Sequence, residues 1–331
     1  MGGSGMSDKL SEVYECYDMT IISTGKGRGM NIVKTDKGIR ALQPLSMSES
    51  RLAKEIELLS AVAEAGYPNV DTCICNQDGD YITYDRYHIP YILKQYYEGR
   101  ECNIRTEADM VRAVDNLAEL HIAMEKVEWI PSEHEPVCKP LYTMERRNRE
   151  LQRVRNYMRK KPSKSEFEYL YLSCFDQYYD QGRQAYAAMK EDPELMKYAR
   201  LSYCHGTYNQ HNVLILKDGM ATVNFDHYSV DHPITDLYTF IRKAMEKNEY
   251  QMELLVRLLE AYTAKYPFEK QDYRLLYYLL WFPEKFWKIS NQYNNMNKAW
   301  TSPKMQEKLY TVIEQECKKQ KLLTVYYKQY C

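Results

Sequence analysis

The chain has 331 residues, 44% of them hydrophobic, which is enough for one domain with two lobes or for two domains with separate cores. Its 45 Lys and Arg residues balance 46 Asp and Glu residues, so the overall positive field that draws proteins onto nucleic acid or anionic membranes is absent. The longest apolar runs are far shorter than the roughly 20 residues that cross a bilayer, so no membrane span is expected.

The nine cysteines are scattered along the chain. Only Cys73 and Cys75 lie close together, at a strand spacing that directs both thiols to one face. No paired CxxC spacing predicts a zinc site, and an odd number of cysteines without a signal peptide favours reduced thiols in a cytosolic setting.

The N-terminal part of the sequence predicts a β-rich region. Residues 1–11, which begin MGGSG, are expected to form a flexible leader. Residues 19–45 alternate β-type runs with glycine, which predicts a series of hairpins. A helix is predicted between a cap at Ser48 or Ser50 and Gly66. Its apolar face is expected to contain Leu52, Ile56, Leu59 and Ala63.

Three further strands are predicted before Gly99, and a helical period dominates after it, apart from a short β interlude near residues 213–227. This change of period predicts an α+β fold with two lobes and a hinge near residues 95–99. Residues 12–98 would form a small N-terminal lobe of β-sheet with one helix, and residues 99–331 a larger helical lobe. The 32 tyrosines against 7 phenylalanines predict that tyrosine replaces phenylalanine at half-buried positions.

Residues 146–165 form a basic segment with an apolar stripe at helical spacing, made of Leu151, Val154 and Met158. The arginines would lie on the opposite side of this helix. A solvated helix face is the favoured interpretation, and a surface for an anionic partner is the alternative. The arginines expected to face outward are Arg146, Arg149, Arg153 and Arg159.

A site for phosphoryl transfer needs a cover for the phosphates, a cation, metal ligands and an acid near the acceptor hydroxyl. The stretch TGKGRGM places Gly25, Gly27 and Gly29 between two strands, where free backbone amides could face phosphates. A glycine-rich hairpin turn without a ligand is the alternative interpretation.

The cation of such a site is expected on the next strand, paired with a glutamate of the following helix. The helix supplies Glu55 and Glu57, but the strand carries Gln43 where a lysine is expected. A neutral amide cannot neutralise phosphate charge as a lysine does. The sequence therefore predicts that the site has lost its main fixed cation.

The stretch HGTYNQHN, residues 205–212, has the outline of a phosphotransferase catalytic loop. His205 would support the loop and Asn212 would be a metal ligand. Thr207 stands where the acid is expected, and its hydroxyl cannot accept a proton from an alcohol near neutral pH. The following strand carries Asn224 where a metal-binding aspartate is expected, and Asp226 two residues later is a candidate replacement ligand.

These motifs resemble the aminoglycoside phosphotransferase and choline kinase-like fold, a protein kinase-like fold. The stretches CHGTYNQHNVL, NFDHYSVDHPITDLYTFIRKAMEKN and FPEKFWKISNQYNNMNKAW resemble the CotS-like family of spore coat proteins of endospore-forming bacteria. The resemblance runs from about residue 12 to the C-terminus. It implies a kinase-like fold and a place in the developing spore coat, and Glu55, Asn212 and Asp236 match the family's residue types.

The resemblance and the departures together predict a pseudokinase that acts by binding in spore coat assembly. Its expected setting runs from the mother-cell cytoplasm to the spore coat, and its expected partners are coat proteins rather than nucleic acid. The alternative is an active phosphotransferase that uses ATP and Mg²⁺, with Asp226 as a relocated metal ligand. The absence of charge at Gln43, Thr207 and Asn224 favours the first hypothesis.

Overall fold

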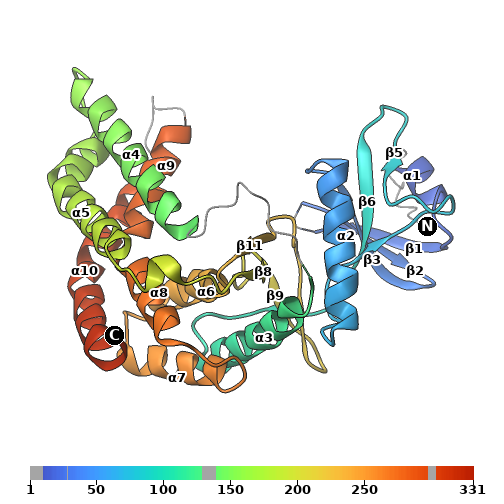
Figure 1. Cartoon of the computed structure of the whole chain (residues 1–331). Helices are drawn as coiled ribbons and strands as arrows, with labels where there is room; N and C mark the ends of the chain where they lie inside the picture. The colour runs from blue at the N-terminus through green and yellow to red at the C-terminus, as the bar shows by residue number, and fades with distance from the viewer. Residues whose placement is uncertain (1–9, 28, 129–138, 297–302) are drawn as a thin grey trace. The chain divides into compact units, whose positions relative to one another are not determined.

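The computed structural model describes residues 10–27, 29–128, 139–296 and 303–331 (Figure 1). These residues divide into two compact units. The first contains the described residues up to Cys102 together with Ile122–Glu128 and His205–Ser229, and the second contains the remainder. Most of the predicted leader, residues 1–9, lies outside the described residues, and Ser11 already begins helix α1 (Ser11–Glu15).

The first unit is built on an antiparallel sheet, which Figure 1 shows beside helix α2. The sheet order is β1-β2-β3-β6-β4, with β5 paired to β6. Its first three strands are consecutive hairpins, as the glycine-punctuated sequence predicts. The strands are β1 (Ile21–Lys26), β2 (Asn31–Thr35), β3 (Gly38–Pro44), β4 (Cys73–Ile74), β5 (Thr83–Tyr84) and β6 (Pro90–Gln95).

Helix α2 (Glu49–Glu64) begins where the sequence predicts. Ser48 is the N-cap, and its hydroxyl accepts a hydrogen bond from the Arg51 amide. The buried face is rotated from the predicted one, because Glu55 is fully buried while Ile56 and Ala63 are only half-buried. The buried apolar residues are Leu52, Leu58, Leu59 and Val62. A buried glutamate in this face requires a cationic partner, which β6 supplies.

The loop segment 205–229 belongs to the first unit because it is hydrogen-bonded to the segment that follows α2. Strands β7 (Arg100–Glu101), β9 (Val213–Ile215) and β10 (Met220–Thr222) form a small antiparallel sheet. The Thr222 amide donates to the Asn69 carbonyl at 3.0 Å, and the Thr222 hydroxyl hydrogen-bonds with the Tyr67 hydroxyl at 2.7 Å. These contacts place residues 205–226 beside the sheet that carries β3 and β6.

The second unit is mainly helical, which confirms the predicted α+β fold class. A two-stranded ribbon, β8 (Ser202–Cys204) with β11 (Ser229–Asp231), and a short 3-10 helix, Leu195–Lys197, interrupt the helices. The helices are α3 (Glu107–Glu125, whose last turn belongs to the first unit), α4 (Lys139–Lys160), α5 (Glu166–Lys190), α6 (Ile234–Lys247), α7 (Met252–Thr263), α8 (Lys270–Trp281), α9 (Glu284–Asn295) and α10 (Pro303–Tyr330).

Buried tyrosines form much of the core between α4, α5, α9 and α10. Tyr171 stacks on Phe286 with ring centroids 4.7 Å apart, and its hydroxyl donates to Ser290. The Tyr178 hydroxyl donates to the Val312 carbonyl. Tyrosine can thus occupy fully buried positions as well as the predicted half-buried ones, because each of these hydroxyls finds a partner.

The basic segment agrees with the predicted helical pattern. Leu151, Val154 and Met158 are buried in α4, and the four predicted arginines are exposed. Residues 161–165 lie beyond the end of α4, and Ser165 is the N-cap of α5.

The described cysteines are all free thiols, whereas Cys138 lies outside the described residues. Cys73 opens strand β4 and is half-buried, and Cys75 is exposed just beyond the strand. None of the described helices combines the length and apolar composition that crossing a membrane requires.

Candidate functional site

A cavity of about 590 Å³ lies within the first unit, between the glycine hairpin, strands β3 and β6, and the loop segment 211–226. Its size is in the range of small-molecule sites. It gathers residues that are far apart in the sequence. Those predicted from sequence are Gly27, Gly29, Gln43, Asn212, Asn224 and Asp226. Gly25, Glu55, His205 and Thr207 do not line it directly.

A lysine that the sequence analysis missed lines this cavity. Lys94 in β6 lies directly opposite Ala41 of β3, and Gln43 lies two residues further along β3. Residues opposite each other in neighbouring strands project to the same face, so Lys94 and Gln43 face the same cavity. The prediction that the site lacks a fixed cation is therefore wrong, because the adjacent strand provides one.

Lys94 is held by two buried carboxylates. Its ammonium lies 2.8 Å from Glu55 Oε1 and 3.4 Å from Asp71 Oδ2. Burial alone would lower the pKa of Lys94, but the Asp71 and Glu55 carboxylates outweigh burial and raise it. Lys94 therefore stays protonated at neutral pH.

The two carboxylates are only partly satisfied by the described residues. Glu55 Oε2 and Asp71 Oδ1 are buried without a hydrogen-bond partner there. Burial raises the pKa of Glu55, and the Lys94 ammonium opposes that rise. One ammonium thus compensates two desolvated carboxylates, which ties the stability of the first unit to Lys94.

His205 fixes the conformation of the loop that carries Asn212. Its Nε2 lies 3.0 Å from the Val223 carbonyl, and its Nδ1 accepts the Thr207 amide at 3.2 Å. The Asn212 amide group donates to the Thr207 carbonyl at 3.0 Å. The loop is thus held by neutral hydrogen bonds, and position 207 offers a hydroxyl instead of a carboxylate.

The predicted metal ligands differ in whether their side-chain oxygens are already hydrogen-bonded. The Asn224 side-chain amide donates to Asn212 Oδ1 at 2.9 Å, and its backbone amide donates to Asp71 Oδ2 at 3.0 Å. The oxygen with which Asn212 would bind a metal is therefore already engaged. The Asp226 carboxylate lines the cavity and forms no hydrogen bond or ion pair with any described residue.

A His-Glu pair at the same cavity was also missed. His211 Nδ1 lies 2.5 Å from Glu101 Oε2, and both side chains are partly exposed. No sequence motif indicates this contact, because Glu101 lies in β7, more than one hundred residues before His211. The Glu101 carboxylate can accept hydrogen bonds from a polar ligand, and the His211 imidazole can donate or accept one.

The described residues contain one group of three His, Cys, Asp or Glu ligand atoms within 4.8 Å of one another, and it lies in the second unit. It consists of His121, Cys204 and Asp236, all buried. His121 Nδ1 is already hydrogen-bonded to the Tyr262 hydroxyl at 2.6 Å, and Nε2 lies 3.3 Å from Asp236. Asp236 therefore contributes to the core of the helical unit.

Three kinds of comparison agree with this architecture. Residues 10–326 match the family model described as "Spore coat putative kinase YutH". The spore coat protein S of Bacillus subtilis (strain 168) is 24% identical over 329 residues, which cover 95% of this chain and 92% of that protein.

Solved structures show the same fold at low sequence identity. An aminoglycoside phosphotransferase from Alicyclobacillus acidocaldarius superposes with a TM-score of 0.83 at 17% identity, covering 99% of this chain and 98% of that one. The amicoumacin kinase hAmiN, solved with AMP-PNP and Ca²⁺, superposes with a TM-score of 0.61 at 11% identity, covering 94% of this chain and 92% of that one. The fold is therefore kinase-like, as the sequence motifs predict.

Proposed function

Since the chain belongs to the family described as "Spore coat putative kinase YutH", we propose that it is a pseudokinase of the spore coat that binds a nucleotide in the first-unit cavity without transferring its phosphate. One observation carries the proposal. The cavity keeps a fixed cation, Lys94, while the catalytic loop offers Thr207 in place of a carboxylate. Such a site can hold phosphate charge but has no general base in that position.

The phosphates would be bound by Lys94 and by backbone amides near Gly29, because the Gly27 amide already donates to the Met30 carbonyl at 2.9 Å. Lys94 remains charged because Glu55 and Asp71 stabilise its ammonium. The glycine hairpin leaves open space at Gly29, where an added Cβ would meet no atom within 4 Å. Glu101 and His211 line the same cavity and are partly exposed, so they are suited to hydrogen bonds with ribose hydroxyls.

The Asn212 and Asn224 side chains are poor ligands for magnesium. The Asn212 side-chain oxygen is engaged by Asn224, and both residues are neutral amides. Mg²⁺ gives up its bound water reluctantly and favours anionic oxygen ligands. Binding of the nucleotide is therefore expected to depend on Lys94 more than on a metal ion.

An active phosphotransferase is the second candidate, and one observation favours it. The Asp226 carboxylate lines the cavity with no partner among the described residues, so it is available to a cation. In that case Asp226 would replace the missing aspartate at position 224. When bound, Mg²⁺ would neutralise phosphate charge.

The binding partners we propose are other spore coat proteins. The support is the match to a spore coat family and to the spore coat protein S of Bacillus subtilis. In this interpretation the bound nucleotide stabilises the conformation of the chain that its coat partner recognises.

Turnover of ATP separates the two candidates. The purified protein is expected to consume no ATP above the protein-free background with Mg²⁺ present, because loss of a general base alone costs about two to four powers of ten in rate. Release of inorganic phosphate and ADP would be followed together. Magnesium-dependent turnover that disappears in Asp226→Ala would refute the pseudokinase proposal and establish the second candidate.

Asn224→Asp is expected to make nucleotide affinity depend on magnesium. The substitution places a carboxylate at the cavity and removes the amide that engages Asn212 Oδ1. Asn224 has a φ of 65°, a conformation that aspartate also tolerates. Calorimetry with Mg²⁺ and with EDTA should show roughly tenfold tighter ATP binding with the metal. Asn209→Asp, in the loop before β9 and outside the cavity lining, is the matched control and should show no such dependence.

A further inference from the structure

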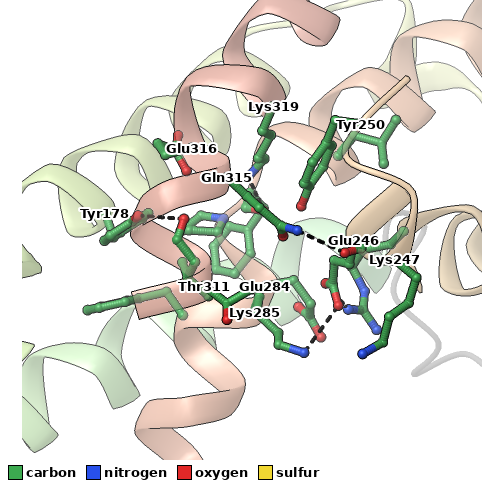
Figure 2. Close-up of a pocket in the computed structure, with 16 residues that line it drawn as sticks. Tyr178, Glu246, Lys247, Tyr250, Glu284, Lys285, Thr311, Gln315, Glu316 and Lys319 are labelled. Carbon is green, nitrogen blue, oxygen red and sulfur yellow. Dashed lines mark hydrogen bonds and ion pairs between the residues drawn. The ribbon is translucent and has the colours of Figure 1, made fainter. Parts of the chain in front are cut away.

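A second, smaller cavity lies within the helical unit, and its lining residues all belong to that unit (Figure 2). It is formed by α5, by α6 and the segment after it, by the junction of α8 and α9, and by α10. Its volume of about 70 Å³ is small, and its walls include several aromatic rings. The cavity is independent of the proposed nucleotide site.

The carboxylates of this cavity already have donors of their own. Cations neutralise Glu246 and Glu284, whereas Glu316 keeps its negative charge because both of its hydrogen-bond donors are neutral amides. Glu246 pairs with Arg242 and Lys285, Glu284 pairs with Arg147 at 2.5 Å, and Glu316 accepts hydrogen bonds from Gln181 and Gln320 at 2.8 and 2.6 Å.

Lys319 is the buried cation of the cavity that lacks a carboxylate, and the exposed Lys247 of the same lining also forms no ion pair with a described residue. Lys319 is 9% exposed, and no described carboxylate lies within 4.0 Å of its ammonium. The ammonium donates to the carbonyls of Trp281 and Phe282, at 3.1 and 3.3 Å, and so caps the C-terminus of α8. Capping uses two of its three protons. Burial lowers the pKa of Lys319, and the more distant Glu316 and Glu246 only partly oppose this effect.

Tyr250 adds a hydrogen-bond donor to the same cavity. Figure 2 shows it entering from the segment after α6, while Lys319 enters from α10. Glu249 and Tyr250 both have positive φ, at 56° and 54°, which is an unfavourable conformation for two consecutive residues with side chains. The Tyr250 hydroxyl forms no hydrogen bond with any described residue.

We propose that this cavity binds a short-chain monocarboxylate, with its carboxylate on Lys319 and Tyr250 and its hydrocarbon part against Leu280, Phe282 and Phe286. A carboxylate accepts hydrogen bonds from both groups and supplies the counter-charge that Lys319 lacks. Since one water needs about 10–15 Å³ of such volume, the cavity holds roughly five non-hydrogen atoms, the size of propionate. The predominantly apolar lining favours a carboxylate with an alkyl group over inorganic phosphate.

The test is calorimetric titration of the full chain with propionate, and in separate runs with propionamide and inorganic phosphate. We expect saturable binding of propionate in the millimolar range, because the ligand is so small. Propionamide has the same shape without the charge and should not bind. Lys319→Met should weaken propionate binding about tenfold or more, and Tyr250→Phe about three- to tenfold.

Lys321→Met is the matched control, since Lys321 is an exposed lysine of the same helix outside the cavity lining, and its affinity should equal that of wild type. Tyr250→Phe keeps the ring and so tests the site even if Lys319→Met fails to fold. Absence of propionate binding by the wild type would overturn the proposal. So would equal binding of propionamide, binding of phosphate alone, or unchanged propionate affinity in Tyr250→Phe and a folded Lys319→Met.

Discussion

Lys94→Met is expected to lower the free energy of unfolding by about 3–5 kcal/mol at pH 7, because it leaves Glu55 and Asp71 buried without their shared cation. Burial already raises the pKa of Glu55 above its ordinary 4.5, and loss of the Lys94 ammonium raises it further. A raised carboxyl pKa means that stability is lost as pH rises through it. The difference in free energy of unfolding between wild type and Lys94→Met should therefore be smaller at pH 4.5 than at pH 7, as measured by urea denaturation.

Lys37→Met is the matched control for Lys94→Met. Lys37 pairs with Asp18 at 2.6 Å, but both side chains are largely exposed and screened by solvent, so loss of Lys37 should change the free energy of unfolding far less than loss of Lys94. Adding Gln43→Lys to Lys94→Met returns a cation to the same face and should recover part of any lost nucleotide affinity. A Lys94→Met variant as stable as Lys37→Met at neutral pH would contradict the charge balance described for this site.

Gly206→Ala is expected to lower the free energy of unfolding by about 2–5 kcal/mol, combining left-handed backbone strain with overpacking. Gly206 has a φ of 79°, and an added Cβ would lie 2.0 Å from the His227 carbonyl oxygen. Because the contact is with backbone, the loop or the segment after β10 must move. That movement would also disturb the hydrogen bonds between His205, Val223 and Thr207.

Gly29→Ala separates the two contributions. Gly29 has a similar φ of 71°, but a Cβ there would meet no atom within 4 Å. Gly29→Ala should therefore lower the free energy of unfolding only by the cost of backbone strain, about 1–2 kcal/mol. Chemical denaturation of both variants measures the difference, and equal losses would mean that Gly206 is not in close contact with His227.

The fold could be predicted from the sequence to a large extent, because local patterns specify most of its elements. The glycines of residues 19–45 predicted the hairpins, and Ser48 with Gly66 predicted the bounds of α2. The buried face of α2 was predicted with an error, because Glu55 is buried by a partner from β6 that no local pattern reveals. Hydrophobic periodicity cannot identify a buried charged residue.

The site could be predicted only where motifs were continuous in the sequence. Gly27, Gly29, Asn212, Asn224 and Asp226 were predicted from three short motifs and line one cavity. Lys94 was missed because its function depends on the register between β3 and β6, which sets it opposite Ala41. Strand register is a tertiary property, and the alternation of PYILKQYY alone does not show which side chain meets Glu55.

The most direct test of the proposed function is calorimetric titration of the wild-type chain with ATP, once with Mg²⁺ and once with EDTA. A cavity in which the Lys94 ammonium is the proposed hydrogen-bond donor to the phosphates, with Asn212 and Asn224 engaged with each other, predicts saturable binding of similar affinity in both titrations. Binding that requires Mg²⁺, or the absence of binding in both titrations, would contradict the proposal.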